Sequence, residues 1–185
     1  MRIGVDIDGV LFPWEEVARE AVSARFGIPK PEPSTYWHYL KDNLPPTCWR
    51  WLWTAEGQNE VFSQVGRTYP GIVEVVNSLL KAGHEVHFVT HRDPRRTAVL
   101  TATFLSLHFG RHPWGGVHII RNSVEKHRLM PWDAFVEDKP ETVWKLLEQE
   151  RARVFAPARP WNEELSDSLA LVRYDDPREI LEALA

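Results

Sequence analysis

Two aspartates near the N-terminus stand where a short buried strand would end. Asp6 and Asp8 follow an apolar run that starts at Arg2, and Gly9 comes directly after them. A carboxylate at the end of a buried strand is unfavourable unless a cation or hydrogen-bond donors accompany it. The two-residue spacing lets both carboxylates reach one cavity, although Asp-Gly is also a common turn pair. The pair alone therefore fits either a shared carboxylate site or a solvated turn.

A second acidic pair follows a later apolar segment. Glu137 and Asp138 come after Ala134-Phe135-Val136, which has the pattern of a short buried strand. Three or four carboxyl groups would then converge at one edge of a sheet, where their mutual repulsion requires a cation. All the candidate ligands are hard oxygens, and no cysteine or histidine cluster accompanies them. This donor set favours magnesium over zinc.

A hydroxyl and an ammonium group complete the set. Thr90 ends another apolar run, and Lys126 lies in a predicted helical turn. Both side chains donate hydrogen bonds to phosphoryl oxygens, so beside a metal they would form a phosphate clamp. Each also has a simpler explanation, Thr90 as a strand-end residue and Lys126 as a solvated helical lysine.

The elements that must position these residues alternate regularly along most of the chain. Apolar periodicity predicts strands at residues 2–7, 84–90, 117–120, 134–137, 153–156 and 169–173. It predicts helices at residues 14–26, 72–81, 95–109, 124–129, 141–151 and 177–184. Such alternation is typical of a parallel α/β sheet, in which ligands bind beyond the carboxyl ends of the strands. The candidate residues Asp6, Thr90 and Glu137 all stand at such ends.

The segment between residues 28 and 69 has a different composition. Five prolines punctuate it, and four of the nine tryptophans of the chain lie in its central part. We interpret it as a group of short helices inserted after the first strand. The predicted organisation is therefore a catalytic core made of residues 1–13 and 70–185, with a small helical cap at residues 14–69.

Length and composition limit the class of protein further. The chain has 185 residues, of which 43% are hydrophobic and 26% charged, as is typical of a globular domain with a small insert. A formal net charge of -4 argues against a broad surface for nucleic acid. The single cysteine, Cys48, excludes an intramolecular disulfide. We see no signal peptide and no run of about 20 apolar residues, so we expect a cytoplasmic protein outside the membrane. A homodimer is compatible with the sequence.

Four short motifs occur in order along residues 6–138. They are Asp6-Ile7-Asp8-Gly9-Val10, Phe88-Val89-Thr90, the single Lys126, and Phe135-Val136-Glu137-Asp138. In type, order and placement they resemble the four motifs of the haloacid-dehalogenase-like (HAD) phosphatase superfamily. The resemblance implies a Rossmann-like parallel sheet with helices on both faces and a small helical cap inserted after the first strand.

The resemblance also implies the roles of the aspartates. Asp6 would be the nucleophile that attacks phosphorus and forms an aspartyl-phosphate. Asp8 would protonate the leaving oxygen and then activate water. Mg²⁺ would be held by Asp6, by the backbone carbonyl of Asp8 and by Asp138. Phosphatases of this family carry the second aspartate, so hydrolysis of a phosphomonoester is expected rather than haloacid chemistry.

The remaining motif residues would surround the phosphate. Thr90 and Lys126 would bind phosphoryl oxygens, and His91, next to Thr90, would line the same site. Glu137 would reach the metal through a water or act on its ligands. Many relatives have aspartate at that position, so the longer side chain leaves the role of Glu137 open.

Within the superfamily, the closest resemblance is to the 5′(3′)-deoxyribonucleotidases. It rests on residues 26–33, 81–86 and 159–162, and on the position of the insert between the first and second motifs. The substrate would then be a small phosphomonoester, a (deoxy)nucleoside monophosphate. The candidate base-binding residues of the cap are Tyr36, Trp37, Tyr39 and Trp49. The same aromatic side chains would also serve as the core of a small helical cap.

A basic cluster directly after Thr90 keeps other interpretations open. Arg92, Arg95 and Arg96 fit a solvated helix start, a contact with a substrate phosphate or a second phosphate, or a track for a nucleic-acid backbone. The last would suit a polynucleotide-end (3′) phosphatase, which shares the same motifs. A non-catalytic binding protein on a HAD fold is a further alternative, against which the intact motif residues speak.

Overall fold

The computed structural model describes residues 1–110, 114–149 and 151–185. Within these residues, six parallel strands form one sheet in the order β3-β2-β1-β4-β5-β6. The strands are β1 (Arg2–Asp6), β2 (Glu85–His91), β3 (Gly116–Ile120), β4 (Ala134–Val136), β5 (Arg153–Pro157) and β6 (Leu171–Tyr174). The predicted parallel α/β sheet is confirmed.

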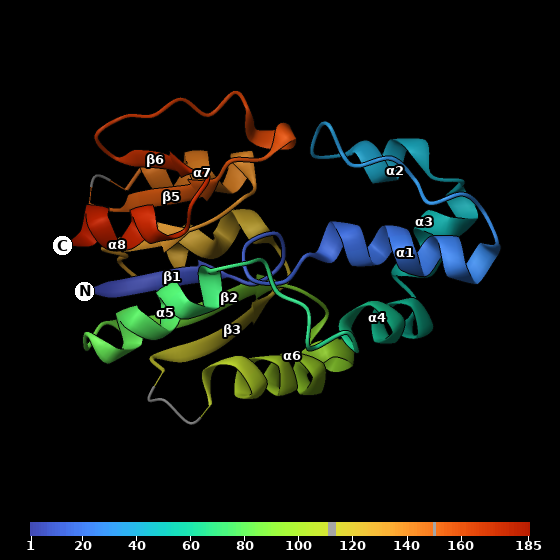
Figure 1. Cartoon of the computed structure of the whole chain (residues 1–185), viewed down its shortest axis with the longest axis horizontal. Coiled ribbons are helices and arrows are strands. Elements are labelled where there is room, and N and C mark those ends of the chain that lie inside the picture. Colours follow the sequence, from blue (N-terminus) through green and yellow to red (C-terminus); the bar gives the residue numbers. More distant parts are fainter. Residues whose placement is uncertain (111–113, 150) are drawn as a thin grey trace.

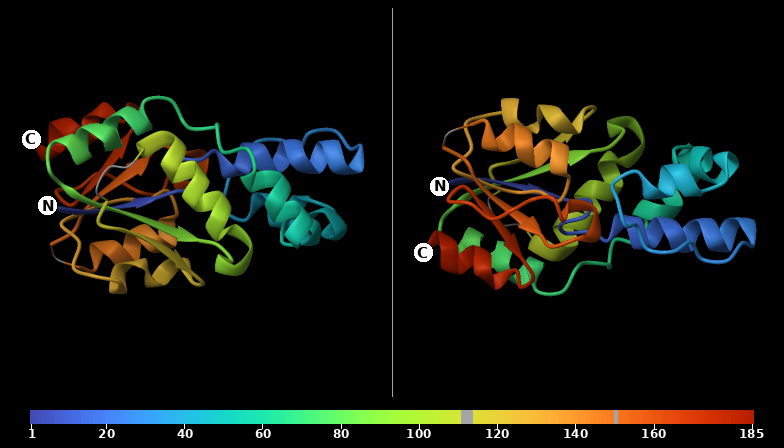
Figure 2. Two further views of the ribbon diagram at one scale, coloured as in Figure 1. Left: turned by 90° about the horizontal axis from the view of Figure 1, so that it is seen from below. Right: turned by 90° about the horizontal axis from the view of Figure 1, so that it is seen from above.

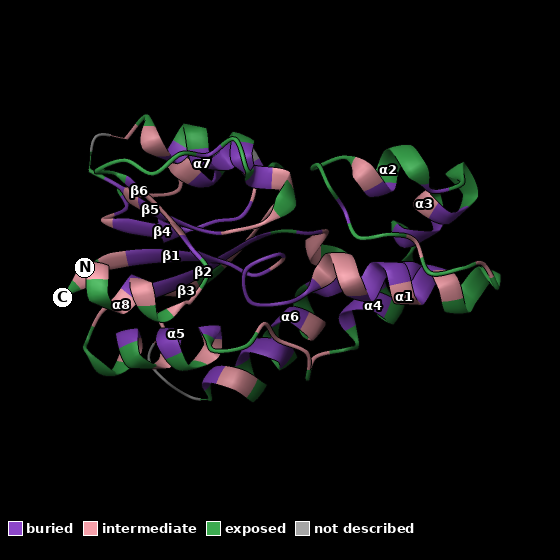
Figure 3. Cartoon of the chain, turned by 45° about the horizontal axis from the view of Figure 1, so that its top comes forward, coloured by how far each residue is buried: buried purple, intermediate pink, exposed green. Residues whose placement is uncertain are grey.

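Helices cover both faces of this sheet (Figures 2 and 3). One face carries α5 (Ile72–Lys81), α6 (Pro94–Phe109) and α8 (Arg178–Leu184). The other carries α7 (Pro140–Leu147) and the 3₁₀ helix η1 (Ser123–Arg128). Two covered faces explain why the central strands are almost continuously apolar, since neither face of such a strand meets water.

The register of the central strands determines which residues meet at the carboxyl edge. Val5 of β1 pairs with Phe88 of β2 on one side and with Val136 of β4 on the other. Because parallel strands end at a common edge, Asp6 lies between the ends of β2 and β4. The strand alignment therefore groups the first, second and fourth motifs in space.

Four helices lie beyond this carboxyl edge, to one side of the sheet (Figure 1). They are α1 (Trp14–Phe26), α2 (Tyr39–Asn43), α3 (Pro46–Leu52) and α4 (Ala55–Phe62). We call residues 14–69 the cap and the rest of the chain the core. The hydrophobic interior continues across the junction, where Phe12 packs 5.9 Å from Phe62 of the cap and 5.9 Å from Phe104 of α6, between ring centroids.

Most predicted boundaries lie within two residues of the observed ones, but α7 differs. The predicted helix 141–151 ends at Leu147, because the chain turns there toward β5: Ala152 N–H bonds to the carbonyl of Gln149 at 3.0 Å. Residue 150 of that prediction lies outside the described residues. Among the described helices, none combines the length and the apolar composition needed to cross a membrane.

Candidate active site

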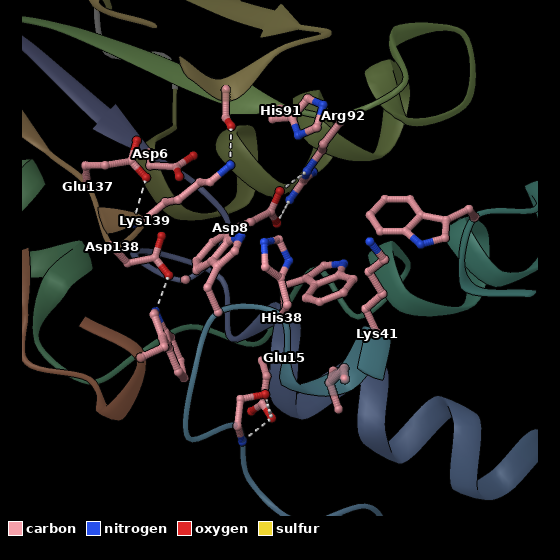
Figure 4. A pocket seen from close by; sticks show the side chains of 18 of the residues that line it. Asp6, Asp8, Glu15, His38, Lys41, His91, Arg92, Glu137, Asp138 and Lys139 are labelled. Carbon is pink, nitrogen blue, oxygen red and sulfur yellow. Dashed lines mark hydrogen bonds and ion pairs between the residues drawn. The ribbon is translucent and has the colours of Figure 1, made fainter. Parts of the chain in front are cut away.

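A cavity of about 490 Å³ lies between the carboxyl edge of the sheet and the cap. This volume is typical of a site for a small molecule. Acidic and basic side chains of the core line one side, as Figure 4 shows for Asp6, Glu137, Asp138 and Lys139. The cap contributes an aromatic wall made of Trp14, Tyr36, Trp37, Trp49, Trp53 and Phe62.

The loop after β1 folds tightly against Asp138, and Gly9 permits this. Gly9 has a φ of +86°, which side-chain-bearing residues rarely adopt. A Cβ at this position would lie only 2.0 Å from Oδ2 of Asp138. The glycine that follows the two aspartates is therefore required both by its backbone conformation and by the close approach of the fourth motif.

Three buried carboxylates and one ammonium group form the centre of the site. Asp6, Glu137 and Asp138 each have a carboxylate oxygen within 4.8 Å of the others. Nζ of Lys126 lies 2.6 Å from Oδ2 of Asp6 and 2.7 Å from Oε2 of Glu137. The backbone N–H of Lys139 donates to the other Glu137 oxygen at 3.1 Å. Glu137 is thus held on both oxygens and fixes Lys126 beside Asp6.

Burial and charge crowding shift the ionisation of these groups. Burial, and then the charge of Glu137, raise the pKa of Asp6 well above its usual range, while Lys126 acts in the opposite direction. Burial and the charge of Asp6 raise the pKa of Asp138 to about 7. Burial alone would lower the pKa of Lys126, but Asp6 and Glu137 raise it above its ordinary value. One ammonium group therefore does not balance the three carboxylates.

The arrangement fits a divalent cation. Oδ1 of Asp138 is buried and has no hydrogen-bond partner among the described residues, whereas Oδ2 accepts a 3.2 Å hydrogen bond from Nε1 of Trp161. The carbonyl oxygen of Asp138 accepts from Nδ2 of Asn162 at 3.1 Å, which fixes the backbone. An orphaned carboxylate oxygen beside Asp6 is a hard ligand of the kind that Mg²⁺ prefers.

The Asp8 side chain does not belong to the group of three buried carboxylates and is held by an arginine. The Arg92 guanidinium donates from Nε to Oδ2 of Asp8 at 2.8 Å and from Nη2 to Oδ1 at 2.6 Å. Its third nitrogen, Nη1, donates to the hydroxyl of Thr101 on α6 at 2.8 Å. The guanidinium carbon also lies 3.9 Å from the centre of the Phe62 ring in the cap. Arg92 therefore links Asp8, the core and the cap.

Thr90 of the second motif and the two residues that follow it lie in different surroundings. The Thr90 side chain is fully buried and donates its hydroxyl to Oδ2 of Asp8 at 3.0 Å, so it lies behind the cavity wall. His91 and Arg92 line the cavity itself. Burial lowers the pKa of the His91 imidazole, and the nearby charge of Lys126 lowers it further.

The cap aromatics divide into a wall and an interior. Tyr36, Trp37 and Trp49 line the cavity. Tyr39 lies one layer behind, where it packs edge-on against Tyr36 with 5.5 Å between ring centroids. Trp51 belongs to the interior, since it is only 8% exposed and packs against Phe26. Of the four aromatic candidates, three face the cavity.

Several residues that line the cavity are not predicted from the sequence. Lys139 follows the fourth motif, and its Nζ lies 3.0 Å from Oγ of Ser123 and 5.4 Å from the centre of the Trp37 ring. Trp161 contacts Asp138 from a segment 23 residues away. Its only sequence signal is the run Arg159-Pro160-Trp161-Asn162, which contributed to the nucleotidase resemblance. Glu15, His38 and Lys41 enter from the cap without any motif (Figure 4).

Solved structures share this architecture over nearly the full length. A haloacid dehalogenase-like hydrolase from Xanthomonas campestris superimposes with a TM-score of 0.59 at 12% identity, covering 100% of this chain and 94% of the other. CbbY from Rhodobacter sphaeroides, in complex with phosphate, gives 0.59 at 15% identity, covering 97% and 95%. A HAD hydrolase from Entamoeba histolytica gives 0.60 at 12% identity, covering 99% and 96%. The fold is that of the HAD-superfamily hydrolases.

The family follows from the sequence comparison. The model of the family described as "5' nucleotidase, deoxy (Pyrimidine), cytosolic type C protein" matches residues 1–183, and the chain belongs to that family. A search among curated protein sequences found no match. Family membership identifies a phosphatase of the nucleotidase type.

Proposed function

We propose that this protein hydrolyses (deoxy)nucleoside monophosphates with Mg²⁺, through an aspartyl-phosphate on Asp6. The observation that carries the proposal is the position of Asp6. Its carboxylate lies at the end of the central strand, beside Lys126 and Asp138, at the inner end of a cavity with an aromatic outer wall. Nucleophile, charge compensation and a surface for a flat group thus occur in one site.

The two aspartates divide the chemistry. A carboxylate oxygen of Asp6 attacks phosphorus, the bond from phosphorus to the nucleoside oxygen breaks, and Asp8 gives its proton to that oxygen. In the second half, Asp8 takes a proton from a water that attacks phosphorus, and the carboxylate of Asp6 is released with inorganic phosphate. Asp8, only partly buried, reaches the cavity and can contact a leaving group there.

The cation ligands in this proposal are Asp6, Asp138 and the backbone carbonyl of Asp8. Mg²⁺ held there would supply positive charge that offsets the repulsion between the Asp6 carboxylate and a phosphate group. The unpartnered Oδ1 of Asp138 supports this assignment. Lys126, fixed by Glu137, and the His91 ring at the cavity wall would hold the phosphoryl oxygens.

The cap would select the substrate in this proposal, and the core would perform the reaction. Tyr36, Trp37 and Trp49 offer ring faces to a nucleobase, and stacking on one ring contributes about 1–3 kcal/mol. Trp53 meets Trp49 edge-on and stacks on Trp14, so these three rings form a continuous part of the same wall. The proposed division at residues 14–69 separates these two roles.

Phosphate release by the purified protein tests the proposal. The panel would contain nucleoside 5′- and 3′-monophosphates, sugar phosphates and 3′-phosphorylated oligonucleotides, with Mg²⁺ and after chelation. We expect turnover of nucleoside monophosphates that needs the metal. Full activity after exhaustive chelation, or a preference for sugar phosphates, would contradict it.

Variants of the two aspartates test the mechanism. Asp6→Asn should abolish turnover with the fold intact, because an amide does not form an acyl phosphate. Asp8→Asn should lose about 10²–10⁴-fold, the usual contribution of a positioned general acid. Near-normal phosphate release by Asp6→Asn would rule out the covalent route.

A further inference from the structure

A second hollow adjoins the candidate active site. Its volume is about 640 Å³, and it extends along the carboxyl edge toward the end of β3. It shares Trp53, Gln58, His91 and Arg92 with the cavity described above. Because these residues line both spaces, the hollow directly adjoins the cavity that contains Asp6.

Arginines dominate the walls of this hollow, and two of them are uncompensated. Arg92 is bound to Asp8, and Arg96 pairs with Asp93 at 3.4 Å. In the part of the chain that the structure describes, no carboxylate forms an ion pair with Arg95 or Arg121. Both side chains are exposed. The hollow therefore has an excess of positive charge beside an acidic catalytic centre.

The helix that supplies Arg95 increases this excess. Arg95 and Arg96 lie in the first turn of α6, a helix of 16 residues whose first turn has no acidic residue. A helix N-terminus carries partial positive charge, so cations there are unfavourable unless an anion is nearby. Asp93 caps the helix through a 3.0 Å hydrogen bond from the N–H of Arg95, but it is also shared with Arg96. Arg121 adds its charge from the residue after β3.

We infer that this hollow binds a second phosphate group of the substrate, as in a nucleoside 3′,5′-bisphosphate. The inference rests on the proposed function, which places the reacting phosphate at Asp6. The second phosphate lies between Arg95 and Arg121, on the far side of His91 and Arg92. Guanidinium groups suit this ligand because one guanidinium can donate two parallel, charge-assisted hydrogen bonds to two oxygens of the same phosphate.

Paired substrates and three variants test the inference. We would compare kcat/KM for a nucleoside 3′,5′-bisphosphate and for the 5′-monophosphate in the wild type, Arg95→Gln, Arg121→Gln and the double variant. The double variant should lose at least about tenfold on the bisphosphate, mainly through KM, and less than about twofold on the monophosphate. Arg178→Gln removes an equal charge from an exposed arginine on α8 that lines neither cavity, and it should change neither activity.

Equal losses on both substrates would overturn the inference, and so would no loss on either. A loss confined to 3′-phosphorylated oligonucleotides would also overturn it, in favour of a nucleic-acid end as ligand. Calorimetric titration of the Asp6→Asn protein with the same two nucleotides separates this result from failure of the proposed function. Tighter binding of the bisphosphate that the double variant abolishes supports the hollow even without turnover, and equal binding of both nucleotides rejects it.

Discussion

At the scale of single residues, the contact between Asp8 and Arg92 is the feature with the clearest mechanistic consequence. A fork of two hydrogen bonds fixes the plane of the carboxylate as well as its position. Arg92 is itself fixed by Thr101 and by the Phe62 ring. In the proposed mechanism Asp8 must be within hydrogen-bond reach of the leaving oxygen, and Arg92 would then act as a positioning residue for Asp8.

The loss of activity caused by substituting Arg92 should therefore depend on the leaving group of the substrate. Arg92→Lys keeps the charge and loses the fork. We expect kcat to fall about 10–100-fold on a nucleoside monophosphate, whose leaving oxygen needs a proton. On p-nitrophenyl phosphate, whose leaving group departs without one, the loss should be smaller than about threefold, with KM nearly unchanged on both.

The hydroxyl of Thr101, which accepts a hydrogen bond from Arg92, allows a control substitution with a smaller expected effect. Thr101→Val removes one hydrogen bond to Arg92 and preserves shape, so it should give the same selectivity with a smaller loss. Thermal unfolding would confirm that both variants are folded. If Arg92→Lys lowers both activities equally and raises KM, then Arg92 binds the substrate phosphate directly and does not position Asp8.

The sequence predicts some of these residues and not others for a physical reason. Asp6, Thr90 and Asp138 are found because strand ends in a parallel sheet meet at one edge. The Arg92 contact depends on how a side chain crosses between the ends of two elements, which spacing along the chain does not determine. Trp161 reaches Asp138 from the loop after β5, and only the folded chain brings them together.

At the scale of elements, the short helices of the cap place their aromatics in two layers. Trp51 and Leu52 of α3 face inward at 8% and 2% exposure, whereas Trp37 at 39% faces the cavity. Composition predicts a helical insert but not this division, because α2, α3 and α4 are too short to show a clear periodicity. The longer α1 and α5 match their predicted ranges, since each has several turns and a glycine close to its end.

The cap wall should discriminate between substrates with and without a base. Trp37→Ala should lower kcat/KM on a nucleoside monophosphate by about 5–100-fold, from the loss of stacking on one ring. The change on p-nitrophenyl phosphate should be smaller than about threefold, because its small ring does not require the full wall. Trp37 is 39% exposed, so the variant should stay folded.

Trp144→Ala is the matched control, since Trp144 is 46% exposed on α7 and does not line the cavity. It should leave both activities unchanged. Tyr39→Phe, in the layer behind Tyr36, should also have little effect. Parallel losses on both substrates in Trp37→Ala would show that the cap aromatics serve structure alone and would remove the main physical support for a nucleotide.

At the scale of the whole molecule, the fold places its acidic groups where burial opposes their charge. The central strand ends inside the protein, and the loop after it is closed by Gly9 against Asp138. Three carboxylates share this interior with one lysine. The stability of the protein should therefore be linked both to protons and to a divalent cation.

The sign of this linkage follows from Asp138. Its pKa is raised to about 7 in the metal-free fold, by burial first and by Asp6 second, against an ordinary value of 3.8. Between these values the folded chain holds a proton that the unfolded chain has lost. The stability from this proton is complete below the ordinary pKa and disappears as the pH rises through about 7.

We therefore expect the chelated protein to unfold at a lower temperature at about pH 8 than at about pH 5.5, by about 5 °C or more. Mg²⁺ should raise the unfolding temperature more at the higher pH, where it does not have to displace the proton of Asp138. Asp138→Asn has no titrating group at position 138 and no negative charge there to bind a cation. Its unfolding temperature should therefore differ less between the two pH values and should rise less with Mg²⁺. Thermal scans of both proteins at the two pH values, with and without the metal, give all four comparisons. The same pH difference in wild type and Asp138→Asn would show that the linkage lies elsewhere, and a Mg²⁺ response equal at both pH values would separate metal binding from this carboxylate.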